Sequence, residues 1–230
     1  MDESTAPNEP KGVPEPTLRR LPLYHRYLKS LQEQERAFVS CTHIGAELGL
    51  DPTQVRKDIE VTGAVGRPKV GYSVPELVLA IEQFLGWDNI NEAFLVGAGS
   101  LGAALLGYTR FQQCGLNIVA AFDTDPAKIG REIHGKYVLA LEKLPDLLER
   151  MHIRIGIITV PAPAAQQVAD LMVGAGVRAI WNFAPVRLRV PDQIIVHNED
   201  LYCSLAALSQ KLAKAMHQEK MKGDTEHAGR

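Results

Sequence analysis

Apolar residues at helical spacing dominate the first third of the chain. Four helices are predicted there, over residues 17–33, 42–48, 51–61 and 75–86. Gly49 ends the second helix, and Asp51-Pro52 begins the third with a capping side chain and a first-turn proline. Glycines at 63, 66 and 71 mark a hairpin between the third and fourth helices. Helix, turn, helix and hairpin is the order of a winged-helix DNA-binding domain.

From residue 93 the pattern changes to short apolar runs that alternate with helical segments. Strands are predicted over residues 93–97, 117–122, 136–139, 153–160, 178–182 and 193–197. Helices are predicted over 100–113, 142–150 and 162–174. This alternation is typical of an α/β fold with a Rossmann-like, doubly wound parallel sheet.

The predicted organisation therefore has two domains, a final helix and two tails. The winged-helix domain spans residues 17–88 and the Rossmann domain residues 89–198. A C-terminal helix follows over 199–220, with leucines at helical spacing. Residues 1–16, which are polar and rich in proline and glutamate, and residues 221–230 are expected to be disordered tails.

Composition narrows the class of protein. The chain has 230 residues and a formal net charge of −2, so DNA contacts must come from a local basic patch. No apolar run approaches the roughly 18 to 20 residues of a membrane span, and the N-terminus lacks the pattern of a signal peptide. The three cysteines and seven histidines show no metal-binding spacing. We expect a cytoplasmic protein without a metal site.

A glycine-rich turn follows the first strand of the Rossmann domain. The expected cofactor contacts here are Gly97, Ala98, Gly99, Ser100, Leu101 and Gly102, which form G-x-G-x-x-G. The glycines allow a tight turn, a close approach of the pyrophosphate to the backbone and close helix packing. Asp123 ends the next strand, where a carboxylate would accept the ribose hydroxyls and repel a 2′-phosphate. NAD(H) is therefore the predicted cofactor, in preference to NADP(H).

Two further loops follow predicted strands of the same sheet. Ligands of doubly wound sheets bind outside the carboxyl ends of the strands, so these loops are the expected neighbours of the nicotinamide. The expected contacts are Val160, Pro161, Asn182, Phe183, Ala184 and Pro185. Neither loop carries an obvious proton relay.

The third helix has a polar face suited to DNA. Val55 and Ile59 are expected to point inward, which leaves Thr53, Arg56, Lys57 and Glu60 on the opposite side. This face would enter the major groove, where arginine and lysine reach bases or phosphates. Arg67 and Lys69 in the glycine-marked hairpin would add wing contacts to the minor groove or the backbone.

With both sites described, the chain resembles the Rex family of redox-sensing transcriptional repressors from about residue 13 to 215. The matching segments are residues 20–24 (Arg-Leu-Pro-Leu-Tyr), 55–58 (Val-Arg-Lys-Asp), 70–72, 96–102, 160–161, 165–166 and 182–185. The resemblance implies a homodimer with a winged-helix and an NAD(H)-binding domain in each subunit, and a C-terminal helix swapped across the dimer. It also implies repression while NAD⁺ dominates and release of operator DNA when NADH binds.

The resemblance further assigns three residues to coupling between the domains: Arg26, Tyr108 and Asp200. Two segments depart from the family pattern. Residues 59–63 place Glu60 on the recognition face, and the wing carries Arg67-Pro68-Lys69 where Arg-Gly or Lys-Gly is usual. The operator sequence and the target genes therefore stay open, as do the NADH/NAD⁺ affinity ratio and any role in activation.

Two other functions compete with a non-enzymatic repressor. One is an NAD-dependent dehydrogenase with an accessory N-terminal domain, but a single helix after the Rossmann unit leaves no substrate domain and no placed acid–base pair. The other is a CoA-binding regulator, since similar domains bind CoA. Asp123 at the ribose position argues against CoA.

Overall fold

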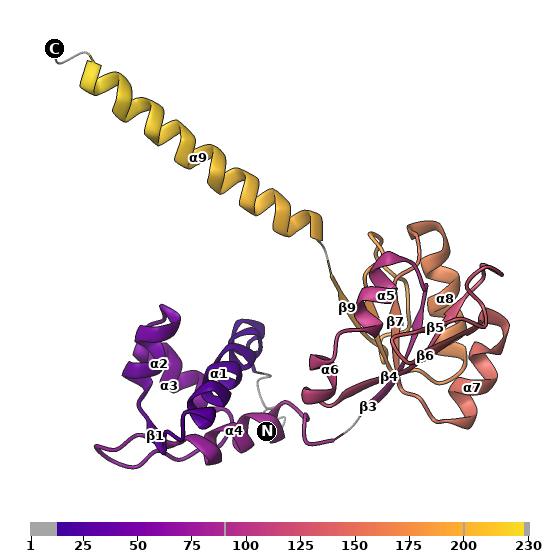
Figure 1. Cartoon of the computed structure of the whole chain (residues 1–230), viewed down its shortest axis with the longest axis horizontal. Coiled ribbons are helices and arrows are strands. Elements are labelled where there is room, and N and C mark those ends of the chain that lie inside the picture. The colour runs from indigo at the N-terminus through magenta and orange to yellow at the C-terminus, as the bar shows by residue number, and fades with distance from the viewer. Residues whose placement is uncertain (1–12, 90, 200, 228–230) are drawn as a thin grey trace, which may run out of the picture. The chain divides into compact units, whose positions relative to one another are not determined.

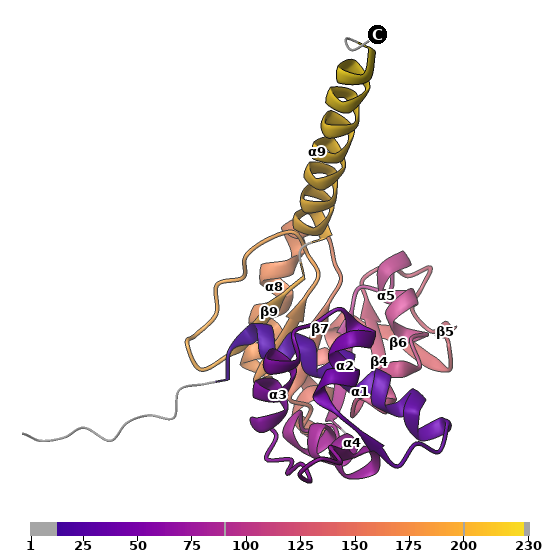
Figure 2. The ribbon, with the colours of Figure 1, turned by 90° about the vertical axis from the view of Figure 1, so that its left-hand side faces the viewer.

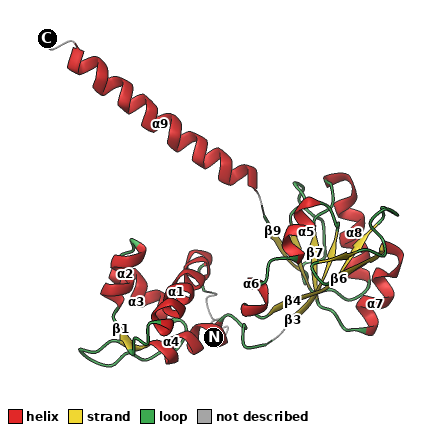
Figure 3. Cartoon of the chain, viewed as in Figure 1, coloured by secondary structure: helices red, strands yellow, loops and turns green. Residues whose placement is uncertain are grey.

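The computed structural model describes residues 13–89, 91–199 and 201–227. The chain divides into two compact units at residues 90–91, with residues 113–115 grouped with the first unit (Figure 1). The first unit is largely helical, and the second contains a sheet flanked by helices (Figure 3). The predicted boundary between residues 88 and 89 lies within two residues of this division.

The first unit has the predicted winged-helix order. Its elements are α1 (Glu15–Glu33), β1 (Phe38–Val39), α2 (Cys41–Leu48), α3 (Pro52–Glu60), β2 (Tyr72–Ser73) and α4 (Val74–Phe84). Ser40 caps α2, Gly49 ends it in the left-handed conformation, and the Asp51 carboxylate accepts from the first amides of α3. The predicted hairpin is a tight loop with one bridge between Arg67 and Gly71.

One apolar core joins the four helices of this unit. Its fully buried members include Leu21, Tyr24, Leu28, Ile44, Val55, Ile59, Leu77 and Ile81. Leu21, Leu28 and Leu31 thus line the inner face of α1, whereas Leu18 is exposed. Val55 and Ile59 fix which face of α3 points outward, because two residues four apart lie on one side of a helix.

The second unit is built on a seven-stranded sheet. Its strands are β3 (Asn91–Val96), β4 (Leu116–Asp123), β5 (Glu132–Ile133), β6 (Lys136–Ala140), β7 (Ile155–Ile158), β8 (Ala179–Asn182) and β9 (Ile195–Asn198). They are ordered β5-β6-β4-β3-β7-β8-β9, and all neighbouring strands are parallel except β5 with β6. The order reverses between β3 and β7, where doubly wound folds bind their ligands.

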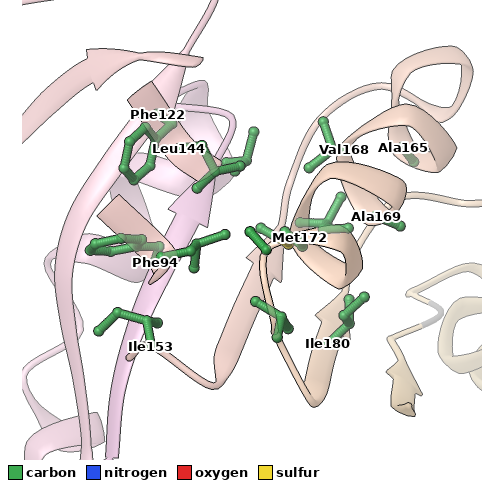
Figure 4. Packing of buried hydrophobic residues seen from close by; sticks show 14 of the residues in the cluster. Phe94, Phe122, Leu144, Ile153, Ala165, Val168, Ala169, Met172 and Ile180 are labelled. Atoms are coloured by element: carbon green, nitrogen blue, oxygen red, sulfur yellow. The ribbon is translucent and has the colours of Figure 1, made fainter. Parts of the chain in front are cut away.

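Helices cover both faces of the sheet. They are α5 (Ser100–Leu106), α6 (Arg110–Gln113), α7 (Leu144–Arg150, after a 3-10 turn at Leu141–Lys143) and α8 (Ala162–Gly174). Phe94 and Val96 pack with α7 and α8, and Met172 of α8 points toward the strands (Figure 4). Ala93 and Leu95 pack with Leu106 of α5 on the other face. The alternation of side chains along β3 thus separates the two core layers.

Three elements differ from the prediction. The helix expected over residues 100–113 is two helices, because α5 ends at Gly107 and α6 begins at Arg110. The ring of His134 leaves no room for a Cβ at residue 107, so this position requires glycine. The short antiparallel strand β5 was not predicted. The expected tail over 221–230 is helical as far as 227, and that over 1–16 gives way to α1 at Glu15; residues 1–12 and 228–230 lie outside the described residues.

The C-terminal helix α9 (Leu201–His227) is continuous in both views (Figure 1 and Figure 2). Every side chain described on it is exposed. Large apolar side chains recur along it at helical spacing: Tyr202, Leu205, Leu208, Leu212 and Met216. Leu208 is 64% exposed, which is unusual for a leucine in such a row.

Candidate functional site

The glycine-rich turn connects β3 to α5 as expected. Gly97 has φ 107°, and a Cβ there would lie 2.8 Å from the carbonyl carbon of Thr159. A Cβ on Gly102 would overlap the carbonyl oxygen of Gly97, whereas nothing lies within 4 Å of the Cβ position of Gly99. Two of the glycines are therefore required by packing, and the third leaves its outer side open to a ligand.

Thr159, at the end of β7, stabilises this turn from the neighbouring strand. Its backbone N–H donates to the carbonyl of Val96 at 2.9 Å, and its Oγ1 donates to the carbonyl of Gly97 at 2.7 Å. The loop that begins at Val160 is thus joined to the glycine turn by hydrogen bonds. The carboxyl ends of β3 and β7 form one continuous rim.

Asp123, at the end of β4, is joined to the same turn. One carboxylate oxygen accepts from the backbone N–H of Ala98 at 2.8 Å and from Nζ of Lys128 at 3.0 Å. The other accepts from the N–H of Asp125 at 2.9 Å. Burial favours the neutral form of Asp123, but these donors outweigh it and hold the pKa of the carboxyl below its ordinary value. Asp123 is therefore an ionised, fixed acceptor.

A cavity of about 570 Å³ lies against these groups. Of the residues predicted to contact a cofactor, Gly97, Gly99, Asp123, Val160 and Pro161 line it. Ala98 and Gly102 are buried behind the turn, and Ser100 and Leu101 are exposed on the first turn of α5. The structure thus brings the turn, the carboxylate and the first proline loop together around one space.

The cavity also has walls that the sequence did not indicate. Lys128, Asp125 and Leu141 line it together with Thr159. Lys128 follows Asp123 by five residues, so a search for basic side chains close to Asp123 in the sequence would have found it. Leu141 carries no such signal, because its place depends on how the segment after β6 folds back.

The second predicted loop, residues 182–185, does not line this cavity. The side chain of Asn182 is fully buried, and its amide nitrogen donates to the carbonyls of Ala184 and Val186 and to Oδ1 of Asn198. Its Oδ1 accepts from the N–H of Ala184. Asn182 therefore organises the loop, and Phe183 and Pro185 are its more accessible members.

The predicted DNA face of α3 is exposed. Thr53, Arg56, Lys57 and Glu60 all lie on its outer side. Nε of Arg56 lies 3.7 Å from Oε1 of Glu60, so the acid partly neutralises the arginine. Lys57 is the basic side chain of this face for which the structure gives no ion pair among the described residues.

The orientation of α3 depends on a buried acid that the sequence analysis did not single out. Asp58 is 1% exposed and accepts hydrogen bonds from Oγ1 of Thr17 at 2.9 Å and from the hydroxyl of Tyr24 at 2.7 Å. Nε2 of Gln54 donates to it at 2.9 Å. The bonds from Thr17 and Tyr24 join α3 to α1.

The structure also describes both predicted wing residues and two of the three predicted coupling residues. Arg67 and Lys69 are exposed, and the guanidinium of Arg67 lies 5.2 Å from the ring centre of Phe38. Arg26 is exposed on α1, and Tyr108 is 49% exposed between α5 and α6. Asp200 lies outside the described residues.

Across the described part of the chain, no group of three or more His, Cys, Asp or Glu side chains could hold a metal ion. No helix there is both long and apolar enough to cross a membrane.

Comparisons with known proteins match parts of both units and, for full relatives, most of the chain. Residues 12–59 match a family model described as a putative DNA-binding protein N-terminus, and residues 88–186 match one described as a CoA binding domain. The redox-sensing transcriptional repressor Rex of Treponema denticola is 47% identical over 84% of this chain and 92% of its own. That of Bacteroides thetaiotaomicron is 44% identical over 87% of this chain and 91% of its own.

The chain belongs to the Rex family of redox-sensing transcriptional repressors. A crystal structure of a Rex-family repressor, RSP, in complex with NAD⁺ and operator DNA is 36% identical, with a TM-score of 0.84 over 93% of this chain and 99% of that one. RSP in complex with NADH gives a TM-score of 0.81 at 35% identity over 92% of this chain and 100% of that one.

Family membership decides between the functions that the sequence left open. The relatives are named as transcriptional repressors, so the comparisons do not favour the alternative of an NAD-dependent dehydrogenase. The Rex structures contain NAD⁺ or NADH within the same overall fold, which does not favour a CoA regulator.

Proposed function

We propose that this protein represses transcription in response to the NADH/NAD⁺ ratio, binding operator DNA at low NADH and releasing it when NADH binds. The observation that carries the proposal is the cavity at the carboxyl ends of β3, β4 and β7, where the glycine turn faces an ionised Asp123. RSP supports it, because it is similar over nearly the whole chain and its structures contain both ligands and operator DNA.

The adenosine half of NAD(H) fits this cavity. The open side of Gly99 admits the pyrophosphate, and Asp123 retains acceptor capacity for the ribose hydroxyls beside the three N–H donors that it already binds. Ser100 and Leu101 present backbone amides at the mouth of the turn. Val160 and Pro161 continue toward the nicotinamide, whose outer neighbours are the loop residues Phe183, Ala184 and Pro185.

Operator DNA is bound by the outer face of α3 and by the wing. Lys57 and Arg56, with Thr53, are the contacts of the recognition helix, and Arg67 and Lys69 are those of the wing. Glu60 limits how far Arg56 is available for the groove. The positive φ of Lys69 (62°) turns the tip of the wing between Pro68 and Val70.

A second copy of the chain completes the protein. The apolar row on α9 is exposed along its described length, and burial of such a row against a partner is favourable by roughly 25 cal/mol per Å². We therefore propose a homodimer in which α9 packs on the partner, as a swapped helix does. In this dimer Arg26, Tyr108 and Asp200 couple cofactor binding to the placement of the recognition helices. Since it would act on genomic DNA, we propose that the protein works in the cytoplasm.

Operator binding measured across an NADH titration tests the function. Labelled genomic fragments are first screened for binding with NAD⁺ present, and the bound fragments are then titrated with NADH, NADPH or CoA. Release by NADH alone supports the proposal. Binding that no nucleotide affects would contradict it, and release by CoA would support the regulator alternative.

The dimer has its own test. Leu208→Asp with Leu212→Asp should turn a dimer into a monomer in light scattering after size-exclusion chromatography, because two charges cannot be buried in an apolar contact. Ala207→Asp with Gln210→Asp, which places two charges on the same helix but away from the apolar row, is the matched control. A double leucine variant that stays dimeric would remove α9 from the interface.

A further inference from the structure

A row of four aromatic rings crosses one face of the Rossmann unit. The ring centres of Phe183 and Trp181 are 4.9 Å apart, those of Trp181 and Phe111 5.4 Å, and those of Phe111 and Tyr108 4.8 Å. All three spacings lie in the range where aromatic pairs favour a particular tilted or edge-on arrangement. Phe183 belongs to the loop proposed to face the nicotinamide, and Tyr108 to the proposed coupling residues.

Trp181 is the member of this row that also reaches the segment before α9. Its indole Nε1 donates to Oε1 of Glu199 at 3.2 Å. The backbone N–H of Glu199 donates in turn to the carbonyl of Asn182, and Nε2 of His197 lies 3.2 Å from the same carboxylate oxygen. Glu199 precedes Asp200 in the sequence, and α9 begins at Leu201. One side chain therefore contacts both the aromatic row and the approach to the C-terminal helix.

The backbone under Trp181 is fixed, so the row can respond only through its side chains. Strand β8 is hydrogen-bonded on both sides, to β7 and to β9, and Trp181 sits opposite Ile157 and His197. Phe111 and Trp181 pack on the apolar layer of Leu95 and Ile157. Neighbouring rings favour particular tilts, so a change in the orientation of one ring alters the favoured orientation of the next.

Space for a second ring position exists at the far end of the row. A cavity of about 300 Å³ is lined by Tyr108, Phe111, Leu105, Ile118 and His134, among others. Tyr108 is about half exposed and donates its backbone N–H to Leu105. Its ring therefore has room to turn, whereas the backbone of Trp181 is held between two strands.

We propose that Trp181 is a positioning residue of the redox switch. It links the loop at Phe183 to Tyr108 through Phe111, and it links the same loop to the start of α9 through Glu199. This inference rests on the proposed function. A change in the nicotinamide that moves Phe183 would alter the favoured orientation of each ring in turn. Through these two sets of contacts, one change at the nicotinamide would affect both Tyr108, the proposed coupling residue, and α9, the proposed dimer helix.

The decisive quantity is a ratio: the NADH concentration that half-releases an operator probe, divided by the dissociation constant for NADH from calorimetry. Trp181→Leu removes the ring contacts, and Phe111→Leu removes only the link to Tyr108. Both should raise the ratio about threefold or more, the range expected for residues that carry coupling between sites. Trp181→Phe keeps a ring and removes the N–H donor, so it should raise the ratio by less than Trp181→Leu.

Trp87→Phe is the matched control, because it makes the same substitution in the winged-helix unit and should leave the ratio at the wild-type value. If Trp181→Leu and Phe111→Leu also leave it there while wild type is released by NADH, the inference is wrong and the proposed function stands. If NADH does not release wild type, both are wrong. If only Trp181→Phe leaves the ratio unchanged, the hydrogen bond from Trp181 to Glu199 is not part of the coupling.

A spectroscopic measurement separates coupling from a structural role. The chain has two tryptophans, so 5-fluorotryptophan labelling of Trp87→Phe gives one fluorine resonance, from position 181. That resonance should differ between the NAD⁺ and NADH complexes, and Phe111→Leu should reduce the difference. The same resonance position in both complexes would contradict the inference even if every variant folds.

Discussion

Arg20 on α1 and Asp58 on α3 form a two-point ion pair inside the winged-helix unit. Nε of Arg20 donates to one carboxylate oxygen at 2.6 Å, and its NH2 group donates to the other at 2.9 Å. A planar guanidinium and a planar carboxylate joined twice fix both distance and orientation. Together with the buried Val55 and Ile59, the pair therefore fixes how α3 is rotated about its axis, and with it where Lys57 points.

Loss of this pair should destabilise the winged-helix unit. Asp58→Ala leaves Arg20, Tyr24 and Thr17 without their buried acceptor, at a cost of about 3 kcal/mol in the free energy of unfolding. Asp146→Ala, which removes an exposed pair with Arg150, should cost less than about 1 kcal/mol. Urea unfolding followed by circular dichroism compares the two variants, and equal costs would show that the Asp58 network contributes little.

The same carboxylate should make stability depend on pH in a defined window. Burial alone would raise the pKa of Asp58, but the donors from Arg20, Tyr24, Thr17 and Gln54 outweigh it and lower the pKa from 3.8 to about 2. A lowered folded-state pKa stabilises the fold above the unfolded value, and this contribution is lost as the pH falls through the folded one. About 2 to 3 kcal/mol should therefore disappear between roughly pH 4 and pH 2.

Asp58→Asn tests this pH dependence, because the amide does not titrate. Its unfolding free energy should fall less steeply over that window than that of wild type. Parallel curves for the two proteins would assign the acid sensitivity to other carboxylates.

Asp123→Ala should weaken NADH binding. A hydrogen bond to a charged group contributes about 1.5 to 3 kcal/mol, and the variant should lose that much affinity together with part of its preference over NADPH. Asp192→Ala, which changes an exposed acid after β8, is the control. Calorimetric titration showing unchanged affinity and selectivity would remove Asp123 from the ribose site.

Lys57→Ala should weaken operator binding while NADH affinity stays intact. The expected loss is about 1 to 3 kcal/mol if a base contact is removed, and the salt dependence should become shallower if the contact is to a phosphate. Lys143→Ala, an exposed lysine in the 3-10 turn before α7, is the matched control. A mobility shift identical to that of wild type would mean that another face of the unit reads DNA.

Tyr108→Phe should separate binding from switching. The variant keeps the ring that packs on Phe111 and removes the hydroxyl, so it should bind operator and NADH as wild type does. A nearly complete switch needs about 5.5 kcal/mol of differential binding, and loss of one contributor should raise the NADH concentration needed for release. Mobility shifts across an NADH titration measure this, and release at the wild-type concentration would exclude the hydroxyl from the switch.

The sequence predicted those features that depend on local pattern. The four helices of the first unit, the six parallel strands and the glycine turn with Asp123 follow from periodicity, caps and one short motif, and the structure contains all of them. The break at Gly107 was missed, although a glycine inside a predicted helix can mark its end. The close approach of the His134 ring to Gly107 depends on segments distant in sequence, which the local pattern does not show.

Long-range partners explain the other omissions. Asp58 follows Val55 by three residues and so shares the inner face of α3, but a carboxylate gives no sign in the sequence of which donors would pair with it there. Its partners Thr17, Arg20 and Tyr24 lie on α1, more than 30 residues away. Trp181 was likewise not singled out, because in the sequence it is only one of the alternating side chains of the short strand β8. Its contacts with Phe111 and Glu199 depend on strand order, which periodicity does not specify.

Two hydrogen bonds, from the Ala98 N–H to Asp123 and from the Thr159 hydroxyl to the Gly97 carbonyl, affect how fast the protein can exchange nucleotides. They hold the glycine turn in shape through protein atoms alone, so a dinucleotide meets backbone that needs no folding step. Association is then not slowed by an ordering transition, and the residence time of the bound nucleotide sets the pace of exchange. Such a regulator responds to a change in the NADH/NAD⁺ ratio on the timescale of nucleotide dissociation.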